Sequence, residues 1–533
     1  MFDTILQGGT IYDGSGREGY VADIGMQGGK IAAIGNLIEA QAQDCVDVTG
    51  LAVSPGFIDL HTHSDFTLLA NGRAESQVHQ GVTTEVVGQC GFSSAPVKSD
   101  HDAQVMSLGY KAGCVEFGWR SFGEYLDKLD KTPLGVNVAA FVGHGTLYRT
   151  VLGNANVAPS HDQVRQMAYL LEESLEQGAS GFSSGLEYWP GRLAAAEHLI
   201  PLCEVVARHD VLYATHVRNR DIYYDLGFCE ALSTARVSGA RLQISHIQPK
   251  FGAPPYAMQH TLEMIESARR YGTDVAFDVI PHNWAHTSMM QILPSWALEG
   301  GGYKITTRLK DPKIRALIKQ NPSPMWRLVL ARRWGDIVLL YSKTNAELVG
   351  HSFEDIGAKR GKDPYDCVFD LLLEEEQMDA LLWTSQSFSE GDIRLCLQQP
   401  ECGVISDTLA LAPYGVLKDH IGSLSGYGWA ARFLQNYVRT NAVMSLSEGV
   451  RRLTSLPAER LQFKDRGSLR PGFCADVTVF DPTDIQSRCS VNQPRVYATG
   501  IAHVLVNGEF SMRHGERTDI DAGSVIRSGM KRH

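Results

Sequence analysis

Two histidines that stand one residue apart, His61 and His63, end the apolar run at residues 56–63 (GFIDLHTH). In an extended strand, alternate side chains point to the same side, so both imidazole rings can face one point. Neutral imidazole is a common metal ligand, and two rings at one strand end could hold a cation between them. A hydrogen-bonded pair of histidines would give the same pattern, so this pair alone does not decide between the two.

Four more side chains with the chemistry of metal ligands or proton carriers end apolar runs in the same way. They are Cys90, His216, His246 and Asp407. Any one of them could be structural, since a buried free cysteine usually behaves as a small hydrophobic residue. Parallel barrels, however, have their active sites at the carboxyl ends of their strands. Five strand ends with such side chains rarely coincide by accident, so we expect them to form one site.

The segments that must position these residues alternate between short apolar runs and amphipathic stretches. The expected strands lie at residues 136–142, 181–184, 211–215, 242–245 and 274–278, with amphipathic segments such as 163–177 and 197–208 among them. This alternation is typical of strand–helix units with a parallel sheet, and many consecutive units favour a closed barrel. The sequence therefore predicts an α/β fold, a (β/α)8 barrel.

Both ends of the chain contain short apolar segments broken by turns, which is typical of small β-units. They lie at residues 4–53 and 467–508 and could pair into one sheet domain. We expect this domain to comprise residues 1–54 and 466–533, with the barrel at residues 55–465. A less regular stretch near residues 294–350 is expected to be an insertion that caps the barrel mouth.

The composition excludes several classes of protein. Hydrophobic residues make up 44% of the chain and charged residues 20%, as in ordinary globular domains rather than disordered or fibrous chains. The formal net charge of -11 offers no basic surface for nucleic acid.

Neither a signal peptide nor a run of about 18 apolar residues is recognisable, so we expect no membrane association. Ten cysteines without paired spacing are typical of free thiols in a reducing compartment. The expectation is a cytoplasmic protein, with homo-oligomerisation left open.

Several motifs occur in the order found in one enzyme family. They are residues 55–65 (PGFIDLHTHSD), 88–91 (GQCG), 185–188 (GLEY), 215–218 (THVR), 245–246 (SH) and 406–407 (SD). Over its whole length the chain resembles the amidohydrolase superfamily, and within it the N-acyl-D-amino-acid deacylases, or D-aminoacylases. The resemblance implies a barrel with a small β-sandwich built from both termini, and hydrolysis of an amide bond in a small-molecule substrate.

For the site, the resemblance implies zinc. In many members of the superfamily a modified lysine bridges two metals, whereas the D-aminoacylase branch has a cysteine there, and Cys90 resembles that residue. Cys90, His216 and His246 would hold one zinc ion tightly and leave a fourth position for water. His61 and His63 could hold a second, weaker metal together with Cys90.

Asp407 is the expected proton-transfer residue, which accepts a proton from water and later donates it to the leaving amine. In the family, a segment with histidine and arginine follows this aspartate and could meet a substrate carboxylate, but residues 408–415 (TLALAPYG) contain neither. A buried carboxylate needs another cationic partner. The candidates are Lys250, Arg218, Arg220 and Lys418.

The substrate-binding residues that we expect are Tyr188, Lys250, Trp284 and Arg218. Lys250 follows the ligand His246 closely and would meet a carboxylate. If the substrate is instead a neutral amide, the aromatic side chains should dominate binding through apolar contact.

Two other functions stay open at this point. A cyclic-amide hydrolase of the dihydropyrimidinase type shares the fold and the opening motif, but such enzymes generally use the bridging lysine. A non-catalytic relative would usually have lost ligands or the aspartate, and this chain keeps them.

Overall fold

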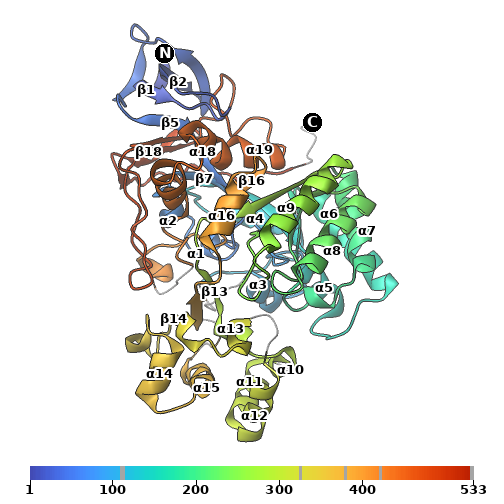
Figure 1. Cartoon of the computed structure of the whole chain (residues 1–533). Coiled ribbons are helices and arrows are strands. Elements are labelled where there is room, and N and C mark those ends of the chain that lie inside the picture. Colours follow the sequence, from blue (N-terminus) through green and yellow to red (C-terminus); the bar gives the residue numbers. More distant parts are fainter. Residues whose placement is uncertain are drawn as a thin grey trace.

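The computed structural model describes residues 1–107, 114–299, 301–322, 327–376, 378, 381–418 and 423–528. Figure 1 shows three parts in a row: a β-sheet that contains the N-terminus, a barrel in the middle, and a lobe rich in helices on the far side of the barrel. Within the described ranges, no helix combines the length and the apolar character needed to cross a membrane.

Eight parallel strands form the barrel wall, in the order β16-β12-β11-β10-β9-β8-β7-β6. Their bounds are β6 Phe57–Asp59, β7 Val82–Val87, β8 Asn137–Gly143, β9 Gly181–Gly185, β10 Leu212–His216, β11 Arg241–Ile244, β12 Val275–Val279 and β16 Cys402–Val404. Just beyond the ends of β6 and β16, Thr62 pairs with Thr408 in parallel, so the first strand meets the last. The predicted (β/α)8 barrel is confirmed.

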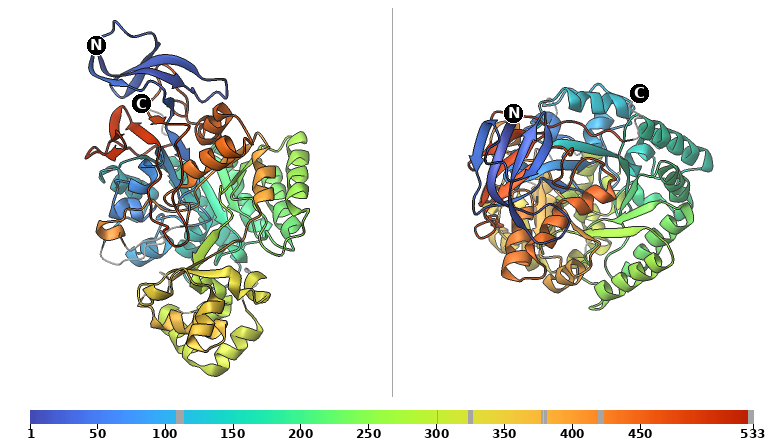
Figure 2. Two further views of the ribbon diagram at one scale, coloured as in Figure 1. Left: turned by 60° about the vertical axis from the view of Figure 1, so that its left-hand side comes forward. Right: turned by 90° about the horizontal axis from the view of Figure 1, so that it is seen from above.

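Helices surround the strands, as the view from above in Figure 2 shows. The larger ones are α4 Phe122–Asp130, α5 His144–Leu152, α6 His161–Glu176, α7 Ala196–Arg208, α8 Tyr224–Ser238, α9 Ala257–Arg270 and α16 Glu390–Leu397. In α6, Ser160 and Gln163 form a capping box at the start of the helix. The buried residues Val164, Met167 and Leu171 follow at helical spacing, which gives one apolar stripe.

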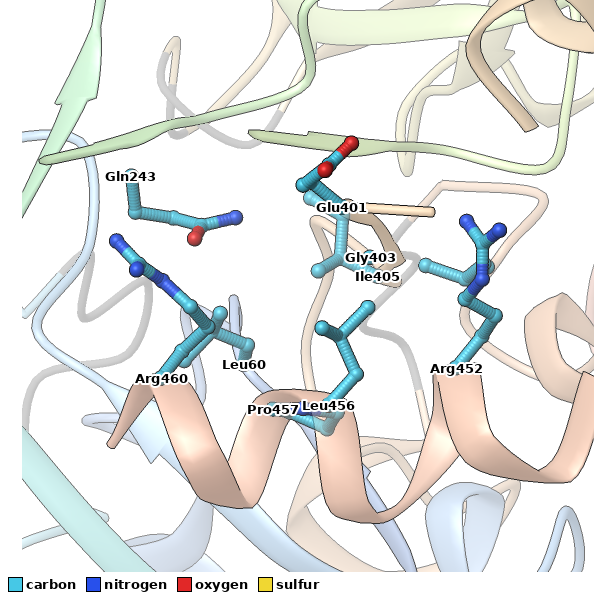
Figure 3. Close-up of a pocket in the computed structure, with 10 residues that line it drawn as sticks. Leu60, Gln243, Glu401, Gly403, Ile405, Arg452, Leu456, Pro457 and Arg460 are labelled. Atoms are coloured by element: carbon cyan, nitrogen blue, oxygen red, sulfur yellow. The ribbon is translucent and has the colours of Figure 1, made fainter. Parts of the chain in front are cut away.

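Short helices close the end of the barrel where its strands begin. Helices α18 (Leu446–Leu453) and α19 (Ser455–Arg460) contact β6, and Ala458 packs into the cluster of apolar side chains that fills the barrel. Figure 3 shows Arg452, Leu456 and Arg460 around a small cavity at this end. Further short helices are α1 Thr67–Ala70, α2 Glu75–Val78, α3 Asp100–Met106, α17 Trp429–Arg432 and the π-helix Phe433–Thr440.

The two ends of the chain share one nine-stranded sheet, in which β17 pairs antiparallel with β5. Its strands are β1 Phe2–Ile11, β2 Tyr20–Gln27, β3 Lys30–Gly35, β4 Ala42–Asp47, β5 Ala52–Pro55, β17 Val477–Phe480, β18 Ile501–Val506, β19 Glu509–Arg513 and β20 Glu516–Arg517. Ile24, Val53 and Leu505 contribute to its buried core. The β-rich unit expected from both termini is confirmed, while its boundaries at residues 54 and 466 stay predictions.

The lobe lies between barrel strand β12 and helix α16 in the chain. It contains the antiparallel sheet β13-β15-β14, with β13 Ala285–Ser288, β14 Ile337–Tyr341 and β15 Leu382–Ser385. Its helices are α10 Ser295–Leu298, α11 Gly301–Lys310, α12 Pro312–Gln320, α13 Arg327–Leu330, α14 Phe353–Arg360 and α15 Pro364–Glu374. The lobe is therefore longer than the expected insertion at residues 294–350. The sequence did not indicate this, because α14 and α15 have amphipathic patterns that resemble those of barrel helices.

Candidate metal centre and active site

The side chains that the sequence predicts as ligands converge at the carboxyl ends of the barrel strands. One donor atom from each of His61, Cys90, His246 and Asp407 lies within 4.8 Å of the others. Cys90 Sγ is 3.3 Å from His61 Nε2 and 3.4 Å from His246 Nε2. Asp407 Oδ1 is 3.3 Å from His61 Nε2. These residues follow or end four different strands, so the closed barrel is what brings them together.

His216, the last residue of β10, adds a donor to this cluster. Its Nδ1 lies 3.2 Å from His246 Nε2 and 3.8 Å from Cys90 Sγ. With zinc bonds of about 2.0–2.3 Å, tetrahedral geometry sets neighbouring donor atoms about 3.3–3.6 Å apart. The donors of Cys90, His216 and His246 therefore fit one zinc ion that keeps an open coordination position.

His63 also contacts the carboxylate of Asp407. Its Nε2 is 3.2 Å from Asp407 Oδ1, and its ring centroid is 5.4 Å from that of His61. His61, His63 and Asp407 thus form a second group of donors, which meets the first at Cys90. This geometry fits a second cation beside the first.

Three residues of the cluster have a left-handed backbone that residues with a side chain seldom adopt: φ is 52° at Cys90, 36° at His246 and 51° at Asp407. Such strain persists only where the surroundings hold it, and it gathers at functional sites. The buried carboxylate of Asp278 accepts the backbone N–H of His246 at 2.6 Å. At Cys90 the packing is tight, because a Cβ on Gly185 would lie 2.0 Å from the Cys90 carbonyl oxygen.

Burial and neighbouring charges set the protonation states of the cluster. Burial raises the pKa of the Cys90 thiol well above its usual range, so a proton stays on sulfur until a cation replaces it. Burial also opposes the ionisation of Asp407, but His246, His61 and His63 outweigh it and hold the pKa of this carboxyl well below its usual range. Asp407 is therefore ionised, with both oxygens free of a proton.

Glu187, directly after Leu186 at the end of β9, connects His216 to Lys250. Its two oxygens accept from His216 Nε2 at 2.7 Å and from Lys250 Nζ at 2.6 Å. Burial alone would raise the pKa of Glu187, but the charge of Lys250 and the bond from His216 lower it to about 2. Glu187 holds the proton of His216 on Nε2, which leaves Nδ1 free to bind a metal. Carboxylates that accept from a histidine ligand commonly fix its tautomer in this way.

Sequence reasoning gives Glu187 no role, although the motif at residues 185–188 contains it. Its partners are 29 and 63 residues away in the chain, so no local spacing reveals them. His286 in β13 is also absent from the predicted site. Burial lowers the pKa of His286 to about 4, and the charges that act on it come from Asp407 and His63, so it lies beside the cluster.

Two of the four predicted substrate-binding residues lie at the cluster. The ring of Tyr188 is 4.7 Å from that of His216, in an edge-on arrangement. Lys250 lies in the same neighbourhood, since its partner Glu187 also binds His216.

The other two predicted residues have contacts of a different kind. Trp284 packs with leucines of the lobe and the barrel, among them Leu340 and Leu424. Arg218 pairs with Glu230 at 2.9 Å and donates to the carbonyl oxygens of Arg192 and Ala194. The structure does not bring these two side chains into the group of ligand donors.

The amidohydrolase family model matches residues 44–276 and 419–512, which is more than half of the chain. The chain belongs to the amidohydrolase family. Among curated proteins, a D-aminoacylase from Alcaligenes xylosoxydans xylosoxydans is 32% identical over 98% of this chain and 97% of its own length. The resemblance to the D-aminoacylases within this family is confirmed.

Solved structures of amidohydrolases agree with this assignment. The N-acyl-D-glutamate deacylase from Bordetella bronchiseptica, complexed with zinc and a phosphonate mimic of the tetrahedral intermediate, is 29% identical, with a TM-score of 0.83 over 99% of both chains. A D-hydantoinase is 16% identical, with a TM-score of 0.54 over 98% of both chains. The second likeness shows the common fold alone.

Proposed function

We propose that this amidohydrolase uses zinc to hydrolyse the linear amide bond of N-acyl-D-amino acids. The observation that carries the proposal is the group of Cys90, His216 and His246 donors, spaced for one zinc ion, with the ionised Asp407 beside it. The full-length likeness to a D-aminoacylase and to a zinc-containing N-acyl-D-glutamate deacylase supports the same chemistry.

In this proposal Cys90, His216 and His246 hold one zinc ion tightly, and His61 and His63 contribute to a second, weaker site. One soft sulfur and two imidazole nitrogens are a typical donor set for zinc in proteins. When bound, zinc polarises a carbonyl oxygen and makes water a nucleophile near neutral pH.

Asp407 carries the proton in this proposal. Its carboxylate accepts a proton from the attacking water and then donates it to the nitrogen of the leaving amine, so that one group serves as base and then as acid. The contact with His63 at 3.2 Å orients the carboxylate. Tyr188, next to His216, would provide an apolar wall for the substrate.

The alternatives have less support. A cyclic-amide hydrolase would generally carry a bridging lysine where this chain has Cys90, and the likeness to a hydantoinase extends only to the fold. A non-catalytic role has no support, because the ligand residues and Asp407 are all retained.

We also propose a cytoplasmic location, which the ten free cysteines support. Homo-oligomerisation and the absence of nucleic-acid binding stay predictions of the sequence.

A hydrolysis screen on the zinc-loaded protein tests the proposed function. The substrates are N-acetyl-D-methionine, N-acetyl-D-glutamate, their L-enantiomers, the uncharged amide of N-acetyl-D-methionine, and hydantoin. We expect turnover of at least one N-acetyl-D-amino acid and much slower turnover of its L-enantiomer. Turnover of hydantoin without any turnover of the linear amides would contradict the proposal.

A further inference from the structure

Arg220 is a buried cation beside the metal cluster that the roles assigned so far do not use. It lies in the loop after β10, and only 4% of the residue is exposed. Its Nη1 donates to the carbonyl oxygen of His246 and, at 3.3 Å, to that of Gln248. Its guanidinium carbon lies 5.8 Å from the centre of the Phe388 ring. The contact with the backbone of His246 sets Arg220 beside a metal-ligand residue.

The contact between Arg220 and the Phe388 ring lies toward the inside of the barrel. Phe388 belongs to the apolar cluster that includes Leu60, Ile280 and Ile405. The guanidinium of Arg220 is therefore held between the backbone of His246 and the apolar interior near the barrel mouth.

The guanidinium of Arg220 has an incomplete set of partners. Among the described residues, no carboxylate lies within salt-bridge distance of its guanidinium, and its Nε has no hydrogen-bond partner. Glu187, the nearby buried carboxylate, is already shared by Lys250 and His216. Carbonyl oxygens satisfy donors but carry no net charge. Burying a cation without a counter-charge costs free energy, and a bound anion would offset that cost.

The other three cations considered from the sequence are placed differently. Lys250 pairs with Glu187 and Arg218 with Glu230. Lys418 is exposed to solvent. Of the four, Arg220 alone combines deep burial with no described carboxylate partner, and its planar fork of donors matches the two oxygens of a carboxylate.

We propose that Arg220 binds the carboxylate of the substrate, in place of the arginine that is missing after Asp407. This inference rests on the proposed function, because it names the acidic group of the same substrate. The shared chemistry is a carboxylate, which is either the α-carboxylate of every N-acyl amino acid or the side-chain carboxylate of an acidic one.

The test compares an acid with its uncharged analogue. Wild type, Arg220→Met and Arg220→Lys are assayed on N-acetyl-D-methionine, on its amide and on N-acetyl-D-glutamate. For Arg220→Met we expect the ratio of kcat/KM for the acid to that for the amide to fall at least thirtyfold, mainly through KM, with zinc content unchanged. Arg220→Lys keeps the charge and should recover part of the ratio.

The two sources of the carboxylate give different results in the same assay. If Arg220 binds the α-carboxylate, both N-acetyl-D-methionine and N-acetyl-D-glutamate lose activity in Arg220→Met. If it binds the side-chain carboxylate, only the glutamate substrate does.

Arg236→Met is the control, since it removes an exposed arginine from α8 (Tyr224–Ser238), the helix that follows the same loop. The proposal is overturned if Arg220→Met changes neither the acid-to-amide ratio for N-acetyl-D-methionine nor kcat/KM for N-acetyl-D-glutamate, or if Arg236→Met causes the same loss. If wild type hydrolyses none of these substrates, the proposed function fails, and binding of succinate is measured by calorimetry. Binding that Arg220→Met weakens at least tenfold would still support the anion site, and binding that it leaves unchanged would refute it.

Discussion

Each end of the barrel contains a buried arginine, and the two arginines differ in whether a carboxylate pairs with them. Where the strands begin, Arg452 lines the small cavity shown in Figure 3. Its side chain is 3% exposed, and its partners are the carboxylate of Glu448 and the carbonyl oxygens of Cys402 and Leu397. Where the strands end, Arg220 has carbonyl partners but no carboxylate among the described residues. The first end is therefore organised for stability, whereas the second keeps charge available for a ligand.

The largest effect expected at the strand ends is that of Asp407→Asn. An amide cannot accept the proton of water but preserves the shape of the side chain, so kcat should fall on the order of a hundredfold or more. Steady-state kinetics together with zinc analysis would check this. Full activity in the variant would move the proton-transfer role to another residue.

Removal of the Cys90 thiol, which lies between the two groups of donors, should weaken zinc binding strongly. In Cys90→Ala one of three ligands is lost, so we expect zinc content to drop from about one per chain to well below that level. Cys203→Ala is the control, because Cys203 is equally buried but lies in α7, outside the cluster. Elemental analysis that finds undiminished zinc in Cys90→Ala would exclude this residue as a ligand.

A smaller effect on metal affinity is expected for Glu187, which accepts a hydrogen bond from the ligand residue His216. Glu187→Gln keeps a hydrogen-bond acceptor for His216 but leaves Lys250 without its counter-charge. Changes in carboxylates behind a histidine ligand typically cost about 10–100-fold in metal affinity. Competition with a zinc chelator would measure the loss. Equal affinity in wild type and variant would mean that Glu187 serves the fold alone.

At the opposite end of the barrel the expected effect is on stability and not on chemistry. Glu448→Gln leaves the buried Arg452 without a carboxylate, which should lower the free energy of unfolding by about 2 kcal/mol, the usual scale for a hydrogen bond to a charged group. Urea unfolding would measure this, and kcat/KM should stay within about twofold. A large loss of activity without a loss of stability would break the contrast between the two ends.

The sequence alone predicts those parts of this enzyme that local pattern determines. The apolar runs before His61, Cys90 and His216 have the length and composition of buried strands, and each run ends in a residue that can bind a metal. Both the barrel and its ligand residues could therefore be predicted. Arg218 and Arg220 could not be distinguished in this way, because they stand two residues apart in one loop. Their partners, Glu230 for one and the backbone of His246 for the other, depend on how distant segments pack.

The extent of the lobe was beyond prediction for a related reason. Helices α14 and α15 bury an apolar face against the lobe's own core, which includes Ile356 and Phe369, and not against the barrel. Periodicity shows that a helix has a buried face, but it does not show which sheet or core that face meets.

The pairing of Thr62 with Thr408 has a consequence for how the enzyme acquires its metal. It joins segments that are more than 340 residues apart in the chain, so forming it carries the entropic cost of closing a long loop. His61 and Asp407 flank this junction, and the Asp407 N–H donates to the His61 carbonyl oxygen at 3.1 Å. His61 and Asp407 therefore come together only when the barrel closes, so an incompletely closed barrel would lack the proton-transfer group and the second group of donors.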